Sequence, residues 1–179
     1  MSARLQSQSQ SQSQSQSQSQ SSPQCQRRPM LSQDLDAVQR IEDSAYPFPW
    51  TRSNFIDSLA VGHLAEVLDG GAALLGYFIA MVGVDELHLL NITVGPSWQG
   101  RGLGRALLDA VSRHGRERGL QRLLLEVRES NTRAQALYLR QGFEVIGRRK
   151  AYYPAAQGRE DAVVMSLPLG TAEVAHELD

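Results

Sequence analysis

The sequence predicts an α/β fold in which helices flank a mixed, mostly antiparallel sheet. Runs of apolar residues with the length and composition of strands are interspersed with longer runs whose apolar residues recur every three or four positions. A glycine-rich segment at 95–104 joins one strand-like run to one helix-like run, as in a β-α-β unit, whose crossover is right-handed. These patterns predict one domain over residues 30–169, an ordinary size for a single core.

Composition excludes several functional classes. Hydrophobic residues make up 41% of the 179 positions, enough for a substantial core, and the net charge of −1 gives no bulk attraction to nucleic acid or membranes. The longest candidate membrane span, residues 72–84, is too short. Cys25 is the only cysteine, so no internal disulfide can form, and the N-terminus lacks the apolar core of a signal peptide. We expect a cytoplasmic monomer that binds neither membranes nor nucleic acid.

The two ends of the chain differ from this domain. Residues 6–22 are a Ser-Gln repeat with no apolar side chain to offset the entropy of ordering, so residues 1–29 are expected to form a disordered tail. A glutamine-rich interaction segment is the alternative for this stretch. The composition changes abruptly at Met30, which raises the hypothesis that translation starts there. Residues 170–179 are expected to form a C-terminal tail.

The first half of the domain predicts two helices followed by an antiparallel meander. Apolar residues at helical spacing predict an amphipathic helix over 35–45, and two prolines within 46–50 must end it. Thr51 can cap a second helix that runs to Leu59. Three strand-like runs follow at 63–68, 72–82 and 86–94, with a turn at 69–71 between the first two.

The second half predicts the crossover helix and the closing elements. A helix over 103–118 places its apolar residues on one face, and a strand over 121–127 follows it. Ser130 or Asn131 can cap the next helix, which a glycine ends after residue 141. The closing strands are expected at 143–146 and 161–167.

The glycine-rich segment is the most informative feature for function. A glycine-rich turn before a helix presents backbone N–H groups to an anion, and the helix N-terminus adds partial positive charge. No Walker Gly-Lys-Ser/Thr follows Gly104, and the glycines do not have the dinucleotide spacing. The pattern Gln99-x-x-Gly102-x-Gly104 resembles the acetyl-CoA pyrophosphate loop of the GNAT acetyltransferases. An ordinary strand-to-helix turn is the alternative.

Glu126 is the single carboxylate in the apolar run 123–127. A carboxylate at the end of such a strand is costly to bury unless it is used or paired. An α-amino group has a pKa of about 8 and is mostly protonated at neutral pH, so a general base helps it to attack a thioester. Glu126 is therefore either that base or the partner of Arg122 or Arg128 in a salt bridge.

Asn131 and Tyr138 lie seven residues apart and share one face of the predicted helix. On that face Tyr138 can give its hydroxyl proton to the coenzyme sulfur, and Asn131 can hydrogen-bond the amide arm of the coenzyme. The structural alternatives are a core tyrosine and a simple helix cap.

A wider set of motifs in the same order resembles the RimI branch of the GNAT family, which acetylates the N-terminal alanine of a small-subunit ribosomal protein. The glycine-rich segment is specific only to the superfamily, whereas 126–131 and 152–162 are much more specific to the branch. The Ser-Gln tail has no counterpart in this pattern. The resemblance covers roughly residues 30–169 and rests on 49–50, 99–105, 125–128, 130–131, 136–138, 142–143, 152–154 and 158–162.

The resemblance implies a role for each matching residue. It implies that Glu126 is the general base and Tyr138 the general acid. The residues that it implies for acetyl-CoA binding are Ile92, Thr93, Val94, Gln99, Gly100, Arg101, Gly102, Leu103, Gly104, Arg105 and Asn131. The residues that it implies for the walls of the peptide channel are Trp50, Tyr152 and Tyr153.

The implied function is transfer of acetyl from acetyl-CoA to the α-amine of an N-terminal alanine by direct attack. The implied partner is the N-terminal segment of a small-subunit ribosomal protein. No metal is expected, because the four histidines lack the spacing of metal ligands. Two alternatives stay open: an acetyltransferase of small-molecule amines, and a non-catalytic acetyl-CoA-binding domain.

Overall fold

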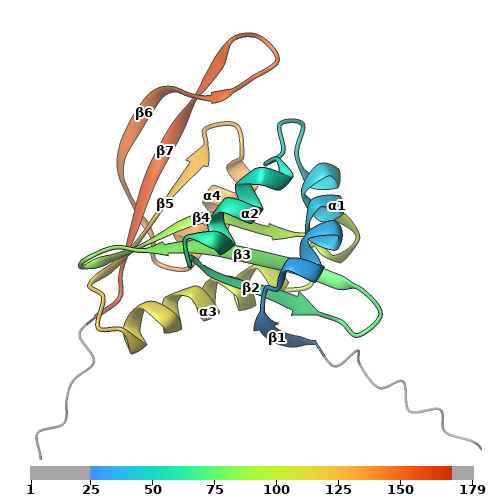
Figure 1. Ribbon diagram of the computed structural model, residues 1–179. Coiled ribbons are helices and arrows are strands. Elements are labelled where there is room, and N and C mark those ends of the chain that lie inside the picture. The colour runs from blue at the N-terminus through green and yellow to red at the C-terminus, as the bar shows by residue number, and fades with distance from the viewer. Residues whose placement is uncertain (1–24, 171–179) are drawn as a thin grey trace, which may run out of the picture.

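A seven-stranded sheet organises residues 25–170, the part of the chain that the computed structural model describes (Figure 1). Helices and strands alternate as predicted, so the α/β class is confirmed. The strands are β1 (Gln26–Pro29), β2 (Leu64–Asp69), β3 (Leu74–Val82), β4 (Glu86–Val94), β5 (Arg122–Arg128), β6 (Glu144–Pro154) and β7 (Arg159–Pro168). The helices are α1 (Leu35–Ala45), α2 (Arg52–Ala60), α3 (Leu103–Glu117) and α4 (Thr132–Arg140), with short 3-10 turns η1 (Ser32–Asp34) and η2 (Pro96–Trp98).

The strand order contains one parallel pair. The strands lie in the order β1-β2-β3-β4-β5-β7-β6, and β4 with β5 is parallel whereas the other neighbours are antiparallel. Parallel neighbours need a long connection, and α3 provides it. The glycine-rich segment therefore lies between β4 and α3, and the mixed, mostly antiparallel sheet is confirmed.

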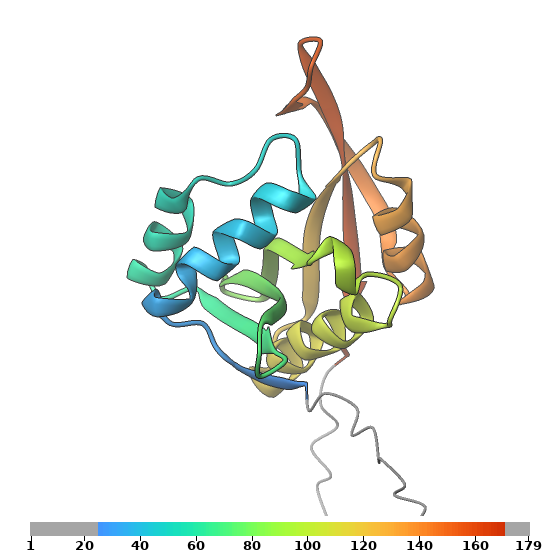
Figure 2. The same cartoon turned by 90° about the vertical axis from the view of Figure 1, so that its right-hand side faces the viewer.

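Helices cover both faces of the sheet (Figure 2). α1 and α2 lie on one face, and α3 and α4 lie on the other. Each pair closes a separate apolar core. Leu107 and Tyr138 belong to the larger core, under α3 and α4, whereas Val38 and Phe55 belong to the smaller one, under α1 and α2. The sheet thus separates two layers of side chains. Side chains from both layers can meet only where neighbouring strands separate.

The pairing of β4 provides such an opening. The register against β3 shifts between Ile79 and Ala80, so Leu90 is an extra residue that forms a β-bulge. On its other side β4 pairs with β5 only as far as Leu89, opposite Leu125, within the described part of the chain. The C-terminal ends of the two strands therefore separate.

The closing hairpin is longer than predicted. The sequence predicts a strand at 143–146, whereas β6 extends to Pro154 and includes the Tyr-Tyr-Pro segment at 152–154. Near its tip β6 pairs with β7 through Tyr153, opposite Glu160. β6 is an edge strand, so it tolerates a proline and the register shift that follows Arg149. The hairpin projects beyond the rest of the sheet (Figure 1).

The N-terminal boundary of the domain also differs from the prediction. Gln26–Pro29 form an edge strand on β2 and are not part of a disordered tail. The Arg28 guanidinium donates two hydrogen bonds to the buried Asp34 carboxylate, at 2.7 and 2.9 Å, and one to Asp69, at 2.9 Å. Composition does not reveal this order, because it depends on contacts with distant acidic residues.

Other predictions for the ends of the chain concern residues that the structure does not describe. The Ser-Gln repeat within 1–24 and the predicted tail at 171–179 lie outside the described residues. A start at Met30 stays a prediction, and a chain that began there would lack β1 and the Arg28 contacts. No helix within residues 25–170 is long and apolar enough to cross a membrane.

Replacement of Arg28 by alanine is expected to destabilise the domain. The buried Asp34 carboxylate would keep the Leu31 backbone N–H as a donor but lose its ion pair. Loss of such charged hydrogen bonds costs about 2 kcal/mol, which denaturation by urea would measure as a lower free energy of unfolding. The control is Arg40→Ala, which removes an exposed arginine from α1 and should change stability by less than about 0.5 kcal/mol.

The effect of Arg28→Ala should depend on pH. The Arg28 guanidinium holds the pKa of Asp34 below its usual range. This contribution is therefore complete above the unfolded Asp pKa of about 4 and is lost as pH falls through the folded value. The stability difference from wild type should shrink at acid pH. A difference that is independent of pH, or one that Arg40→Ala reproduces, would contradict the role given to Arg28.

Candidate active site

A cleft of about 450 Å³ lies between the end of β4, the glycine-rich segment and α4. Arg101 and Leu103 do not line it: the Arg101 guanidinium lies 4.8 Å from the centre of the Trp98 ring, and Leu103 packs against the larger core. The other residues predicted to bind acetyl-CoA line it together with Tyr138, and they are Ile92, Thr93, Val94, Gln99, Gly100, Gly102, Gly104, Arg105 and Asn131.

The backbone of the glycine-rich segment requires glycine at two positions. Gly100 and Gly102 have φ angles of +79° and +78°, which L side chains rarely adopt. A side chain at either position would meet open space, so conformation and not crowding is the constraint. Gly102 is the N-cap of α3, and the N–H groups of the first helical turn have no partner within the helix. These donors and the helix dipole favour an anion at this end of the cleft.

Gln99 holds this segment in place. Its Nε2 donates to the Val94 carbonyl at 3.1 Å, and its Oε1 accepts from Arg133 Nη1 at 2.9 Å. The side chain therefore ties the end of β4 to α4 across the mouth of the glycine-rich segment.

Three arginine side chains bring positive charge to the cleft. Arg105 follows the glycine-rich segment, and Arg133 and Arg140 come from α4. The sequence analysis missed the two on α4, although their spacing with Leu137 places all three residues on one helix face. Guanidinium groups beside a helix N-terminus form a set of donors that suits a diphosphate.

Tyr138 is the buried hydroxyl of the cleft. Its side chain is 7% exposed, and its ring centre lies 5.6 Å from that of Phe143. Burial raises the pKa of Tyr138 above its ordinary value, so the hydroxyl keeps its proton at neutral pH. Asn131 caps α4, because its Oδ1 accepts from the Ala134 N–H at 3.1 Å, and this leaves its amide NH₂ for the cleft.

Glu126 lies on the face of β5 opposite to its neighbours Leu125 and Val127, which belong to the larger core. It does not line the cleft, and it is the first residue of β5 beyond the last pair with β4. Its Oε1 lies 3.0 Å from Arg149 Nε, and its Oε2 accepts from the Tyr152 hydroxyl at 3.1 Å. The Tyr153 hydroxyl donates to the Glu126 backbone carbonyl at 3.1 Å. Side chains of the projecting hairpin therefore contact both oxygens of this carboxylate.

The salt-bridge partners proposed for Glu126 from sequence are engaged elsewhere. Arg122 pairs with Glu86 at 3.6 Å, and Arg128 pairs with Glu160 at 3.3 Å. Arg149, the partner found in the structure, is 23 residues away in sequence, and no local pattern indicates it.

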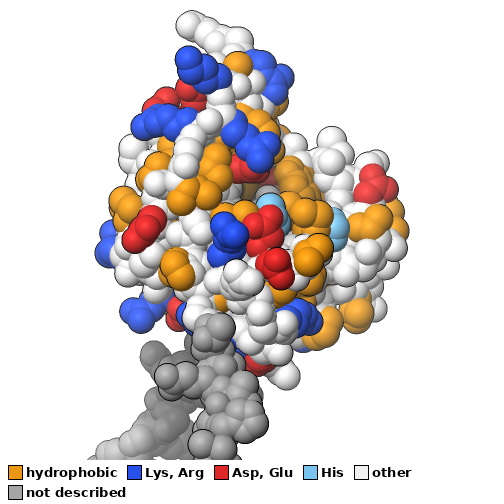
Figure 3. Space-filling view, turned by 90° about the vertical axis from the view of Figure 1, so that its left-hand side faces the viewer, with side chains coloured by type: hydrophobic (Ala, Val, Ile, Leu, Met, Phe, Trp, Pro, Cys, Tyr) orange, Lys and Arg blue, Asp and Glu red, His pale blue; other side chains and the backbone are white. Residues whose placement is uncertain are grey.

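Arg128 connects the loop after α1 with the β6–β7 hairpin. Its guanidinium carbon lies 4.5 Å from the centre of the Tyr153 ring and 5.6 Å from that of Phe48. It also donates to the Pro154 carbonyl at 2.7 Å. The loop after α1 and the β6–β7 hairpin therefore meet over the end of β5. Lysine and arginine side chains also gather on the hairpin (Figure 3).

Trp50 is not brought into the cleft. Its ring centre lies 5.5 Å from that of Phe55, and it packs against the smaller core. Its backbone N–H donates to Glu42 Oε1 at 2.9 Å. The sequence analysis missed Glu42 and also Tyr46, which lines the cleft. The available signal was that Glu42 falls seven residues after Leu35, on the apolar face of α1.

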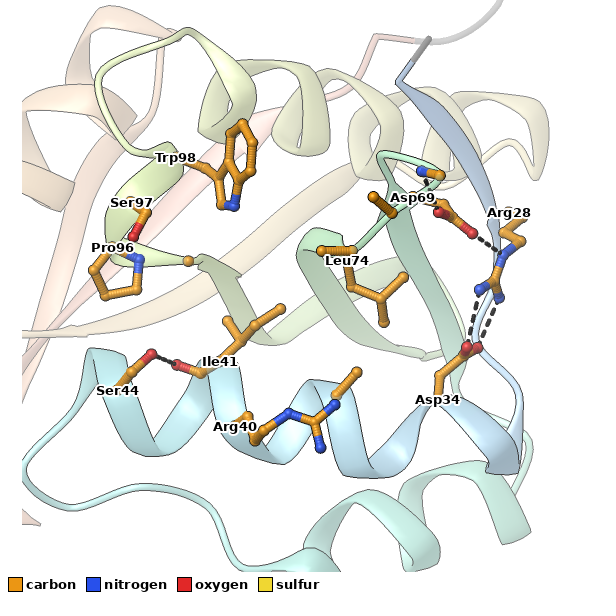
Figure 4. A pocket seen from close by; sticks show the side chains of 15 residues that line it. Arg28, Asp34, Arg40, Ile41, Ser44, Asp69, Leu74, Pro96, Ser97 and Trp98 are labelled. Atoms are coloured by element: carbon orange, nitrogen blue, oxygen red, sulfur yellow. Dashed lines mark hydrogen bonds and ion pairs between the residues drawn. The ribbon is translucent and has the colours of Figure 1, made fainter. Parts of the chain in front are cut away.

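A second cavity of about 470 Å³ lies between α1, the β2–β3 turn and residues 95–98 (Figure 4). None of the predicted site residues lines it. Its charges at Arg28, Asp34 and Asp69 are paired with one another. Within residues 25–170, no group of three or more His, Cys, Asp or Glu side chains is placed to hold a metal ion. The first cleft, which most of the predicted site residues line, is therefore the candidate site.

Comparison with known families agrees with this geometry. The model of the acetyltransferase (GNAT) family matches residues 35–143, from α1 through the glycine-rich segment and Tyr138. This chain belongs to the GNAT acetyltransferase family. GNAT acetyltransferases use acetyl-CoA, and the diphosphate-binding character of the cleft is consistent with that coenzyme.

Individual relatives match most of the chain. The ribosomal protein bS18-alanine N-acetyltransferase of Escherichia coli (strain K12) is 41% identical over 136 residues, which cover 76% of this chain and 92% of that protein. A putative enzyme of the same name from Bacillus subtilis (strain 168) is 35% identical over 140 residues, which cover 77% and 91%. The crystal structure of the E. coli ribosomal-protein-S18-alanine N-acetyltransferase superposes with a TM-score of 0.78 at 37% identity, over 87% of this chain and 99% of that chain. The chain of this GNAT N-acetyltransferase thus spans nearly the whole length of these relatives.

Gly102→Ala is expected to weaken acetyl-CoA binding. A Cβ at a φ of +78° strains the turn that begins α3 and displaces its N–H groups. If the binding free energy of acetyl-CoA falls by about 1 kcal/mol, the Kd rises by about 5-fold, which calorimetric titration with acetyl-CoA would measure.

Gly71→Ala is the matched control. Gly71 has a φ of +81° and open space around the position of its Cβ, but it lies in the β2–β3 turn outside the cleft. Gly71→Ala should lower the free energy of unfolding by about as much as Gly102→Ala does, and it should leave the Kd for acetyl-CoA unchanged. Equal acetyl-CoA affinity in wild type and both variants would reject the glycine-rich segment as the coenzyme loop.

Proposed function

We propose that this GNAT enzyme transfers the acetyl group of acetyl-CoA to the α-amine of the N-terminal alanine of ribosomal protein bS18. The observation that carries the choice of substrate is the 41% identity to the E. coli enzyme of that name, over 92% of its length. The proposal places the enzyme in the cytoplasm, where ribosomal proteins are made, as a monomer that needs no metal.

The cleft is the proposed acetyl-CoA site. Residues 99–105 are assigned to the pyrophosphate, and the strand segment Ile92–Val94 to the acetyl and pantetheine part. Positive φ angles at two glycines, the N-terminus of α3 and three arginine side chains support this assignment. Bound acetyl-CoA supplies an activated thioester, so no covalent enzyme intermediate is required.

Glu126 and Tyr138 are assigned to the two proton transfers. Glu126 takes a proton from the substrate ammonium, which frees the nitrogen lone pair to form a bond with the acetyl carbon. Tyr138 gives its proton to the sulfur as the carbon–sulfur bond breaks, and its buried, protonated state suits that role. The nitrogen loses its second proton as the amide forms, and this proton restores the Tyr138 hydroxyl. The separated ends of β4 and β5 support access of both groups to one centre.

The walls of the peptide path are assigned to the hairpin side. Tyr152 and Tyr153 bond the side chain and the backbone of Glu126, respectively, so a peptide that reaches this carboxylate must pass them. Trp50 contributes by fixing the loop after α1 from the core side.

Release of free thiol from acetyl-CoA tests the proposed function directly. The substrate is a peptide that copies the alanine-starting N-terminus of bS18, and the control is the same peptide with a blocked α-amine. Release with the free amine alone is expected. Release with small amines but not with the peptide would indicate a small-molecule acetyltransferase. Coenzyme binding without release on any amine would indicate a non-catalytic domain.

Glu126→Gln is expected to lower kcat by about 10²–10⁴-fold with little change in acetyl-CoA affinity, because an amide cannot accept the proton. Steady-state rates with the peptide and calorimetry with acetyl-CoA measure the two effects. Glu129→Gln is the matched control, since Glu129 also pairs with an arginine of β6, Arg148. The kcat of this variant should stay within about 2-fold of wild type. Equal rates in wild type and Glu126→Gln across pH would exclude the general base.

Tyr138→Phe is expected to slow acetyl transfer by about 10²-fold or more in a single turnover. Phenylalanine keeps the packing on Phe143, so the melting temperature should change little. Because burial raises the pKa of Tyr138, the wild-type rate should not fall on the alkaline side below about pH 10 through loss of this proton. Single-turnover rates that are the same in both proteins would remove Tyr138 from the mechanism.

A further inference from the structure

Glu42 is a buried carboxylate to which the mechanism above gives no role. It lies on α1, its side chain is 2% exposed, and donors surround both of its oxygens. Oε1 accepts from the Trp50 N–H at 2.9 Å and from Asn91 Nδ2 at 3.3 Å. Oε2 accepts from the Tyr77 hydroxyl and faces the Thr93 hydroxyl at 3.4 Å. A carboxylate that only accepts fits this environment, because every group that faces it can donate.

This carboxylate sets the direction of a chain of hydrogen bonds. Asn91 must turn its NH₂ toward Glu42, so its carbonyl oxygen is left to accept. The Thr93 hydroxyl has one proton and lies 2.9 Å from that oxygen, closer than it lies to Glu42. The Thr93 proton therefore points toward either Asn91 or Glu42, and in both cases away from Tyr46.

The Tyr46 hydroxyl is therefore the donor in its own contacts with β4. It lies 3.1 Å from Thr93 Oγ1 and 3.3 Å from the Ile92 carbonyl. Thr93 has no proton left to offer, and a carbonyl can only accept, so the Tyr46 proton points into the protein. The lone pairs of its oxygen are left free. Tyr46 lines the same cleft as Tyr138, at the strand segment assigned to the acetyl group.

We infer that Glu42 is a positioning residue that acts through Asn91 and Thr93 to keep the Tyr46 oxygen free as an acceptor for the attacking amine. The inference rests on the proposed acetyl transfer to an amine. After Glu126 has removed one proton, the amine still carries two N–H groups. A hydrogen bond from one of them to Tyr46 would hold the amine beside the acetyl carbon equally in the ground state and the transition state, so it contributes to peptide binding and not to the rate of the chemical step.

Tyr46→Phe tests the acceptor without altering the fold, because it removes one oxygen and keeps the ring. The bS18 peptide should show a KM raised by about 10-fold or more, with kcat within about 2-fold and the acetyl-CoA Kd unchanged. An unchanged peptide KM in this variant would overturn the inference.

Glu42→Gln tests the positioning role. An amide in this place can donate as well as accept, so the chain no longer has one direction, and the peptide KM should rise as in Tyr46→Phe. The double variant Glu42→Gln/Tyr46→Phe should have the KM of Tyr46→Phe alone, because Glu42 acts on the amine only through Tyr46. Effects on KM that multiply would indicate a merely structural role and overturn the inference. If Glu42→Gln does not fold, the cycle is run with Asn91→Ala, which removes the nearer acceptor of the Thr93 proton.

The wild-type rate separates this test from the test of the proposed function. Wild type that is inactive on the peptide but active on a small amine would contradict the proposed substrate, and the same variants are then measured with that amine. Wild type that releases no thiol with any amine would overturn both proposals.

Discussion

The separation of β4 from β5 beyond the bulge at Leu90 is the constraint on which the site depends. A regular parallel pair would bond along its whole length and close the sheet, whereas the extra residue in β4 turns the strand end away from its neighbour. The cleft lies on one side of this opening, and Glu126 comes from the other face of the sheet. Two reactants can meet within a continuous sheet only at such a gap.

Buried polar groups hold the loop after α1 against the open end of β4. A carboxylate at the position of Glu42 costs several kcal/mol to bury unless donors satisfy it, and here the Trp50 N–H and the side chains of β3 and β4 do so. An apolar residue would fill the same space at less cost, so stability alone does not explain the carboxylate. A group that accepts in every direction can, however, fix the orientation of each hydroxyl around it.

The Arg128 guanidinium holds the β6–β7 hairpin in position. Arg128 lies between the rings of Phe48 and Tyr153 and donates to Pro154, so one side chain joins the loop after α1 to the projecting hairpin. Neither segment has a core of its own at this point. Their relative position thus depends on contacts made at the end of β5, two residues after the proposed base.

Local features of this protein could be predicted from its amino-acid sequence. Helix caps, prolines and glycines act within a few residues, so they predicted the strand–glycine–helix unit, the order of most elements and the segment that forms the cleft. Tyr138 and Glu126 were also selected from sequence, and their catalytic roles are predictions. Long-range contacts, which are present only in the folded chain, set the extent of β1 and β6 and the partners of charged groups, such as Arg149 for Glu126 and Thr93 for Glu42. These pairings join residues far apart in the chain, and their energy depends on burial and geometry that no local pattern contains.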